Sequence, residues 1–185
     1  IKLNAASGGG SFSLQAPSSS SNNRVFTLPD SADAALLTAT AALGKLGQIV
    51  TQVYEPGGSD ISTTSTSFVD TGMTLSITPS NTNSKIFIFG IANGHRVSSS
   101  VANSIINIER AVSGGSTGVL SGQSLGLAHT YSNLVVNTPI FFVDGTTGTA
   151  QRTYTVQHKT DSGSVTSYIF RANTSNMFVL MEILP

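Results

Sequence analysis

Residues 85–92, Lys-Ile-Phe-Ile-Phe-Gly-Ile-Ala, are the stretch from which the fold class of this chain follows. Apolar side chains occupy both odd and even positions, and successive side chains of a β-strand point to opposite faces. Such a strand is typical of the middle of a sheet that is covered on both faces. The turn-forming run from Pro79 to Asn83 precedes it. The sequence therefore predicts a central β-strand here, buried on both sides.

The segments on either side of this strand are predicted to be further strands. Most of them alternate between apolar and polar residues, which indicates half-buried strands. The predicted strands are Ile49 to Tyr54, Met73 to Ile77, Ile106 to Glu109, Pro139 to Val143, Arg152 to His158, Val165 to Arg171 and Met177 to Leu184. About eight to ten strands over residues 48–185 fit an all-β fold, a β-sandwich or jelly-roll-like domain.

The first 30 residues contain two short alternating runs, one around Phe12 and one around Phe26. The Ser-rich run from Pro17 to Asn23 separates them, and we expect the two runs to form a loose β-hairpin. A lone hairpin buries too little surface to be stable in water. We therefore expect this N-terminal hairpin to pack on a partner subunit.

Residues 31–47 are the one candidate helix of the chain. Asp33 would lie in the first turn, where the helix dipole favours a carboxylate, and Gly44 lies where a helix commonly ends. Ala and Leu dominate between them, but an irregular connector is an alternative. We divide the chain into an N-terminal attachment and oligomerisation arm, residues 1–47, and a β-sandwich domain, residues 48–185.

The composition excludes several classes of partner. Nine basic residues balance nine acidic ones, so the net charge is zero and no strong field favours nucleic acid or an anionic membrane. No apolar run is long enough to insert into a bilayer. The chain has no cysteine and therefore no disulfide or thiolate metal site. It has 28 serines and 22 threonines, and we expect their hydroxyls to form the outer faces of the sheets.

Residues that could carry chemistry are scattered. His95, His129 and His158 do not have the spacing of metal ligands, and we interpret them as polar strand ends or interface hydrogen-bond partners. The many serines leave a Ser-His-Asp triad open on composition alone, but no Gly-x-Ser-x-Gly turn is present, and Gly114 to Gly118 reads as a loop. We predict a non-enzymatic protein with no catalytic, cofactor-binding or metal-binding residues.

Neither the aromatic nor the basic residues show the pattern of a binding site. We interpret four phenylalanines as core residues; they are Phe87, Phe89, Phe141 and Phe142. The basic residues occur one per strand or loop and form no stripe for nucleic acid; they are Arg96, Arg110, Arg152, Lys159 and Arg171. Loops Val97 to Asn103 and Ser113 to Gly118 are expected at the rim of the sandwich, where binding usually occurs.

Two stretches of the sequence carry a resemblance to a known class of proteins. Residues 1–17 (IKLNAASGGGSFSLQAP), continuing to residues 24–30 (RVFTLPD), resemble a segment of bacteriophage virion proteins. These are chiefly tail-fibre and small head- or tail-attached proteins, including those of cyanobacterial and marine phages. Residues 65–80 (STSFVDTGMTLSITPS) are similar to the start of the β-domain that often follows that segment. The resemblance implies a homotrimer on the virion exterior, with no catalytic residues.

Two functions are consistent with this resemblance. In the first, the chain is a homotrimeric short fibre or tail-attached protein whose β-domain contacts a host-surface glycan or protein. In the alternative, it is a capsid decoration (cement) protein that staples capsid subunits at three-fold sites. In both, the expected partners are further copies of the chain and other virion proteins of the tail or capsid, bound through residues 1–47. A glycan depolymerase is disfavoured because that chemistry needs a pair of carboxylates.

Overall fold

The computed structural model of the chain describes residues 2–4, 11–13, 46–99 and 101–185. All regular elements within these ranges are β-strands, so the predicted all-β fold is confirmed. Residues 31–45 of the predicted helix lie outside the described residues. Its last two residues, Leu46 and Gly47, begin a strand instead, so the β-domain starts two residues earlier than expected.

The first two strands form a small hairpin of their own. Strand β1 (Lys2–Asn4) pairs antiparallel with β2 (Ser11–Ser13), and Leu3 is the backbone partner of Phe12. The expected hairpin paired the run around Phe12 with the run around Phe26, which lies outside the described residues. Lys2–Asn4 was not predicted because three residues are too few to show an alternating pattern.

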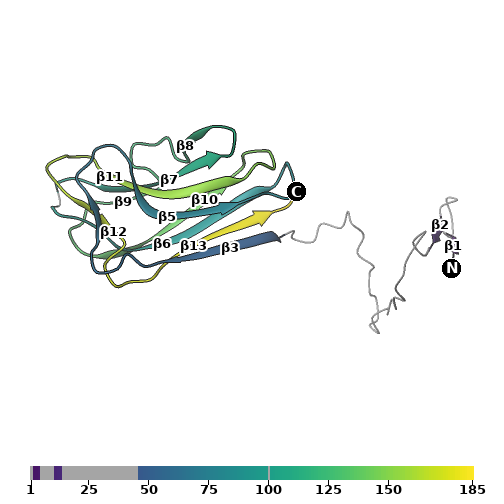
Figure 1. Cartoon of the computed structure of the whole chain (residues 1–185), viewed down its shortest axis with the longest axis horizontal. Coiled ribbons are helices and arrows are strands. Elements are labelled where there is room, and N and C mark those ends of the chain that lie inside the picture. The colour runs from purple at the N-terminus through teal and green to yellow at the C-terminus, as the bar shows by residue number, and fades with distance from the viewer. Residues whose placement is uncertain (1, 5–10, 14–45, 100) are drawn as a thin grey trace. The chain divides into compact units, whose positions relative to one another are not determined.

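The remaining strands form two antiparallel sheets that face each other as the layers of a sandwich (Figure 1). Sheet I consists of β3 (Leu46–Tyr54), β4 (Ile61–Thr63), β6 (Lys85–Val97), β10 (Val136–Asp144), β12 (Ser167–Ile169) and β13 (Asn176–Ile183). Sheet II consists of β5 (Val69–Ile77), β7 (Ser104–Val112), β8 (Thr117–Val119), β9 (Ala128–Thr130) and β11 (Arg152–Thr160). The predicted β-sandwich is therefore confirmed.

The order of the long strands makes the sandwich jelly-roll-like. Strands β10, β6, β13 and β3 lie side by side in sheet I, and β5, β11 and β7 lie side by side in sheet II. The chain changes sheet at every step between successive long strands, as in double-sheet Greek-key folds. The short strands β4, β8 and β9 had not been predicted, again because three-residue strands carry little pattern.

The core lies between the two sheets. Strand β6 contributes Ile86, Ile88 and Ala92 from sheet I. The facing residues of sheet II include Met73, Ile77, Ile106, Ile108, Tyr154 and Val156, all buried. Burying such side chains is the main favourable contribution to folding.

The sandwich has two distinct ends. At one end, called the base, Ile183 is the pairing partner of both Leu46 and Lys85, so the chain enters and leaves the sandwich there. Strand β6 runs from the base to the opposite end, called the tip, which holds Val97 and Ser167. Its 13 residues span roughly 40 Å at about 3.3 Å per residue.

The outer side of sheet I corrects part of the sequence analysis. Strand β6 is central as predicted, but it is buried only on its inner face. Phe87 and Phe89 point outward and are partly exposed, and Phe141 of β10 is 56% exposed. The interpretation of these three phenylalanines as core is wrong for a single chain, because the described residues form only two layers. Phe142 packs against the core as predicted.

Candidate functional site

The outer side of sheet I carries an apolar row that crosses all four long strands: Val143 pairs with Phe87, Phe87 with Met181, and Met181 with Ile49. Phe141 pairs with Phe89, which pairs with Val179, and the rings of Phe89 and Phe141 have centroids 5.2 Å apart. The pairing places the following side chains on this side, here called the apolar face: Ile49, Val53, Phe87, Phe89, Ile91, Pro139, Phe141, Val143, Met177, Val179, Met181 and Ile183.

The apolar face is nearly free of charge. Among the outward positions of these four strands between the base and the Gly94 bulge, Lys85 at the base is the single charged residue. Four strands about 4.8 Å apart and about nine residues long give the face a size of roughly 20 by 30 Å. That is on the order of 600 Å², the upper end of the largest apolar patch found on ordinary monomers, where such patches often mark interaction sites.

The outer side of sheet II is polar. Thr74 and Thr155 hydrogen-bond through their hydroxyls at 3.1 Å, and Ser76 and Thr153 do so at 2.8 Å. The Gln157 amide donates to Asp70 at 2.8 Å. The prediction that hydroxyls form the outer faces of the sheets therefore holds for sheet II and is wrong for sheet I. The two outer sides of the sandwich therefore differ in polarity.

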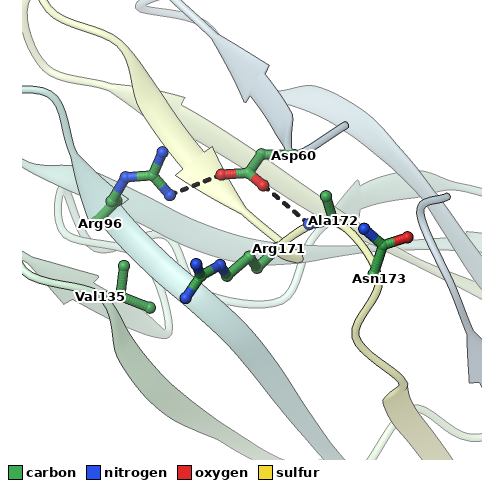
Figure 2. A pocket seen from close by; sticks show the side chains of 6 residues that line it. All are labelled: Asp60, Arg96, Val135, Arg171, Ala172 and Asn173. Carbon is green, nitrogen blue, oxygen red and sulfur yellow. Dashed lines mark hydrogen bonds and ion pairs between the residues drawn. The ribbon is translucent and has the colours of Figure 1, made fainter. Parts of the chain in front are cut away.

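A pocket of about 500 Å³ opens at the tip, on the same outward side of sheet I (Figure 2). Four segments far apart in sequence build it: the β3–β4 connection, β6, the residue before β10 and the β12–β13 connection. The residues that line this tip pocket are Asp60, Arg96, Val135, Arg171, Ala172 and Asn173. Asn93 and its partner Asn137 separate it from the apolar face.

Asp60 anchors one wall of the tip pocket. Its Oδ2 accepts a hydrogen bond from Arg96 Nη1 at 2.7 Å, and its Oδ1 accepts one from the Ala172 N–H at 2.8 Å (Figure 2). Burial raises the pKa of Asp60, but these hydrogen bonds and the charges of Arg96 and Arg171 lower it below its usual value. The carboxylate is therefore ionised at neutral pH, and both of its oxygens are in use.

The two arginines of the tip pocket differ in their partners. Arg96 is held by Asp60 and also lies over the Tyr168 ring, 4.0 Å from its centroid. The guanidinium of Arg171 extends into the pocket (Figure 2) and makes no hydrogen bond or ion pair with any described residue. Two arginines against one carboxylate leave the pocket with one excess positive charge.

A β-bulge in β6 places Arg96 in this wall. Pairing with β10 passes from Asn93–Asn137 to His95–Val136, which leaves Gly94 as an extra residue with φ of 85°. An extra residue reverses which side chains face outward. Odd residues such as Phe89 and Ile91 point outward before the bulge, whereas after it His95 is buried and Arg96 points outward.

Arg171 is fixed at its backbone rather than at its guanidinium. Its N–H donates to the Asn93 carbonyl at 2.8 Å, and its Cβ would lie 2.4 Å from any Cβ at Gly94, so only glycine permits this approach. Phe170 and Asn173, on either side, have φ of 53° and 56°. They are the two non-glycine residues with positive φ in the described part of the chain, and such strain often accompanies ligand-binding segments.

Below the pocket, two buried histidines join the sheets. His95 Nε2 lies 2.9 Å from Ser104 Oγ, Ser104 Oγ lies 2.6 Å from Ser167 Oγ, and Ser167 Oγ lies 2.9 Å from His158 Nδ1. All four side chains are at most 1% exposed. These Ser–His contacts are not at a surface that a substrate can reach, so they stabilise the sandwich instead of providing a nucleophile.

A second buried polar group lies at the base. Asp144 accepts hydrogen bonds from Arg110 Nη1 at 3.0 Å and from the Tyr154 hydroxyl at 2.7 Å. Arg152, which is 1% exposed, lies 3.9 Å from the same carboxylate and donates to the Gly148 carbonyl. The arginines that the sequence shows one per strand or loop are thus brought together in two pairs, one at each end of the sandwich.

The structure places the other residues singled out from the sequence apart from both sites. His129 is exposed on β9, and neither loop expected to bind, Val97 to Asn103 or Ser113 to Gly118, lines the tip pocket. Asp60, Val135 and Arg171 were not predicted to meet. The one available signal was Gly94 within a strand, which often marks a bulge or a close backbone approach.

No metal cluster and no membrane-spanning helix accompanies the tip pocket in the described residues. Residues 46–99 and 101–185, together with the two short N-terminal strands, contain no cluster of His, Asp and Glu able to hold a metal ion. The same residues include no helix of the length and apolarity needed to cross a membrane. No protein-family model matches the chain, and no curated protein matches it significantly.

Proposed function

We propose that the protein is a non-enzymatic structural protein of a bacteriophage virion, a homotrimeric short fibre or tail-attached protein whose β-domain contacts the host surface. The observation that carries this proposal is the apolar face of sheet I. Phe141 and Val143 are about half exposed in a single chain, and leaving such a face in water is costly because apolar burial is favourable.

The occupant of the apolar face is taken to be further copies of the same chain. Interfaces between permanently associated identical subunits are the most apolar class, whereas partners that come and go use more polar surfaces. Closed symmetric rings are the usual way in which identical chains cover such a face. The resemblance to phage virion proteins favours three copies.

The two ends of the sandwich support an attached protein with an outward tip. Residues 1–45 join the sandwich at the base, through Leu46. In the proposed attachment through this arm, the tip pocket lies at the end of the sandwich opposite to the point where the arm joins. An exposed pocket at the far end favours a role in host-surface binding over the alternative role as a capsid cement protein.

The assembly is tested by light scattering on the full chain and two matched variants. Wild type should have three times the 19.1 kDa mass of one chain. Phe141→Asp, on the apolar face, should lose the trimer, and Thr74→Asp, on the polar face of sheet II, should keep it. Circular dichroism checks that each variant is folded. A well-folded wild-type protein with the mass of one chain would overturn the proposal.

The role in the particle is tested by counting and locating copies on purified virions. Gold-labelled antibody at the tail and a small copy number support the fibre or tail-attached role. Copies spread over the whole shell would show the cement role instead. Absence from the virion would contradict both.

A further inference from the structure

We infer that the tip pocket binds the carboxylate of an acidic sugar, with Arg171 as the residue that holds it. The carboxylate is argued from the geometry of the pocket. The sugar rests on the proposed function, in which the tip meets a host surface.

Arg171 provides donors that the described part of the chain does not use. A guanidinium carries five N–H donors in a planar fork, and two of them match the two oxygens of a carboxylate. Such bidentate pairs are stronger than hydrogen bonds between neutral groups. The Arg171 guanidinium extends into the pocket (Figure 2), so an anion that enters can take both oxygens to this fork.

The rest of the pocket selects a single negative charge. Asp60 is paired with Arg96 at 2.7 Å and does not neutralise Arg171 as well. The excess charge of the pocket is one, which matches a carboxylate, whereas a phosphate dianion would leave one charge uncompensated. Both arginines lie on a chain whose net charge is zero, so the attraction of anions to the pocket comes from this local excess of charge.

The remaining wall residues suit a sugar ring. Val135 offers an exposed apolar side chain, and the Asn173 amide offers both a donor and an acceptor for ring hydroxyls. A volume of about 500 Å³ lies within the range of small-molecule sites. Apolar surface with a few fixed polar groups is the usual composition of such sites.

The backbone holds this arrangement in place before any ligand arrives. Arg171 is tied to Asn93, and Asn173 donates its N–H to the Gly57 carbonyl at 2.8 Å. The left-handed conformations of Phe170 and Asn173 are costly and persist only where the surroundings enforce them. A backbone that is ordered in advance loses less entropy on binding.

The experiment is calorimetric titration of the full-length protein with trigalacturonate, with its methyl ester and with sialyllactose. We expect at least one of the two acids, trigalacturonate or sialyllactose, to bind. If trigalacturonate binds, its neutral methyl ester should bind at least tenfold more weakly. Arg171→Gln should weaken acid binding at least tenfold. The matched control Lys159→Gln removes a positive charge from sheet II and should bind like wild type. Affinity should fall as salt is raised.

Four outcomes would overturn the inference. They are no binding of either acid, equal binding of trigalacturonate and its ester, unchanged binding by Arg171→Gln, and binding of inorganic sulfate or phosphate alone. Light scattering on Arg171→Gln separates this inference from the proposed function. If the variant is a trimer that no longer binds the acid, the result supports both the sugar site and the trimeric assembly. Loss of the trimer in this variant would place Arg171 in the subunit interface and overturn the sugar site. A monomeric wild type that binds the acid contradicts the proposed assembly only.

Discussion

The hydroxyls of Ser104 and Ser167 lie 2.6 Å apart, and their hydrogen bond joins sheet II to sheet I. Each hydroxyl also contacts a histidine of the opposite sheet: Ser104 contacts His95, and Ser167 contacts His158. Burial lowers the pKa of both histidines to about 4. This chain of contacts therefore makes the stability of the tip sensitive to acid.

The first prediction is a loss of stability between about pH 6.5 and pH 4. In the unfolded chain the histidines bind protons below about pH 6.5, whereas in the folded chain they remain neutral until about pH 4. Proton binding therefore stabilises the unfolded state relative to the folded state as the pH falls through this range. The expected loss is on the order of 3 kcal/mol per histidine. Urea unfolding at several pH values measures it. His158→Gln should reduce the slope, and exposed His129→Gln should largely preserve it. A flat wild-type profile over this range would contradict the prediction.

The second prediction concerns more acidic conditions. Glu182 Oε1 accepts from the Ser80 N–H at 2.6 Å, and Oε2 accepts from Gln48 Nε2 at 3.0 Å. Burial raises the pKa of Glu182, but these hydrogen bonds outweigh it and lower the pKa to about 2. The resulting stability is present above about pH 4.5 and is lost as the pH falls towards 2. We measure the free energy of unfolding at several pH values in this range. Glu182→Gln should make it depend less on pH, and exposed Glu55→Gln should leave its pH dependence unchanged. Similar acid profiles for the two variants would argue against it.

The third prediction is a large loss of stability in Asp144→Asn. Arg110 and Arg152 would then share no counter-charge, and removing one partner of a buried ion pair typically costs about 3–5 kcal/mol. The free energy of unfolding in urea measures this cost. The matched control is Asp70→Asn on the exposed side of sheet II, where about 1 kcal/mol or less is expected. Equal effects for the two substitutions would show that the buried group does not stabilise the base.

The fourth prediction is that Gly94→Ala disrupts both the bulge and the tip pocket. The added Cβ would lie 2.4 Å from Arg171 Cβ, and the φ of 85° disfavours any residue with a side chain. We expect a loss of about 1–3 kcal/mol from backbone strain, with further loss from the clash. Gly58→Ala, which has open space around it, should be neutral. A Gly94→Ala protein with wild-type thermal stability would mean that the bulge is not required.

The fold was largely predictable because alternation over long strands is a strong signal. Residues 85–92 were correctly assigned to a central strand, and the two-layer sandwich followed from the number and spacing of strands. What the pattern could not show is whether the same chain covers the second apolar side of β6. Positions buried within one chain and positions buried between chains carry the same kinds of apolar residue. The pattern therefore predicts a buried Phe89 in either case.

The tip pocket was not predictable from the sequence. Asp60, Arg96 and Arg171 come from three separate segments, and they meet through the pairing of β4, β12 and β6. The side to which Arg96 points depends on a single extra residue, Gly94, because simple alternation from Phe87 would place Arg96 inward. Long-range pairing and bulges are properties of the folded sheet rather than of a local pattern.

The position of β3 has a mechanical consequence. This strand runs from the base towards the tip and pairs with β13 along its length, from Leu46–Ile183 to Tyr54–Asn176. If the tip pocket holds a ligand as we infer, a pull between that ligand and Leu46 at the base acts along β3. Hydrogen bonds of an antiparallel pair lie perpendicular to the strands, so this force shears all of them together instead of opening them one after another. In the proposed role, this is the direction in which an anchored particle would be pulled from a surface, and we expect the sandwich to resist that tension.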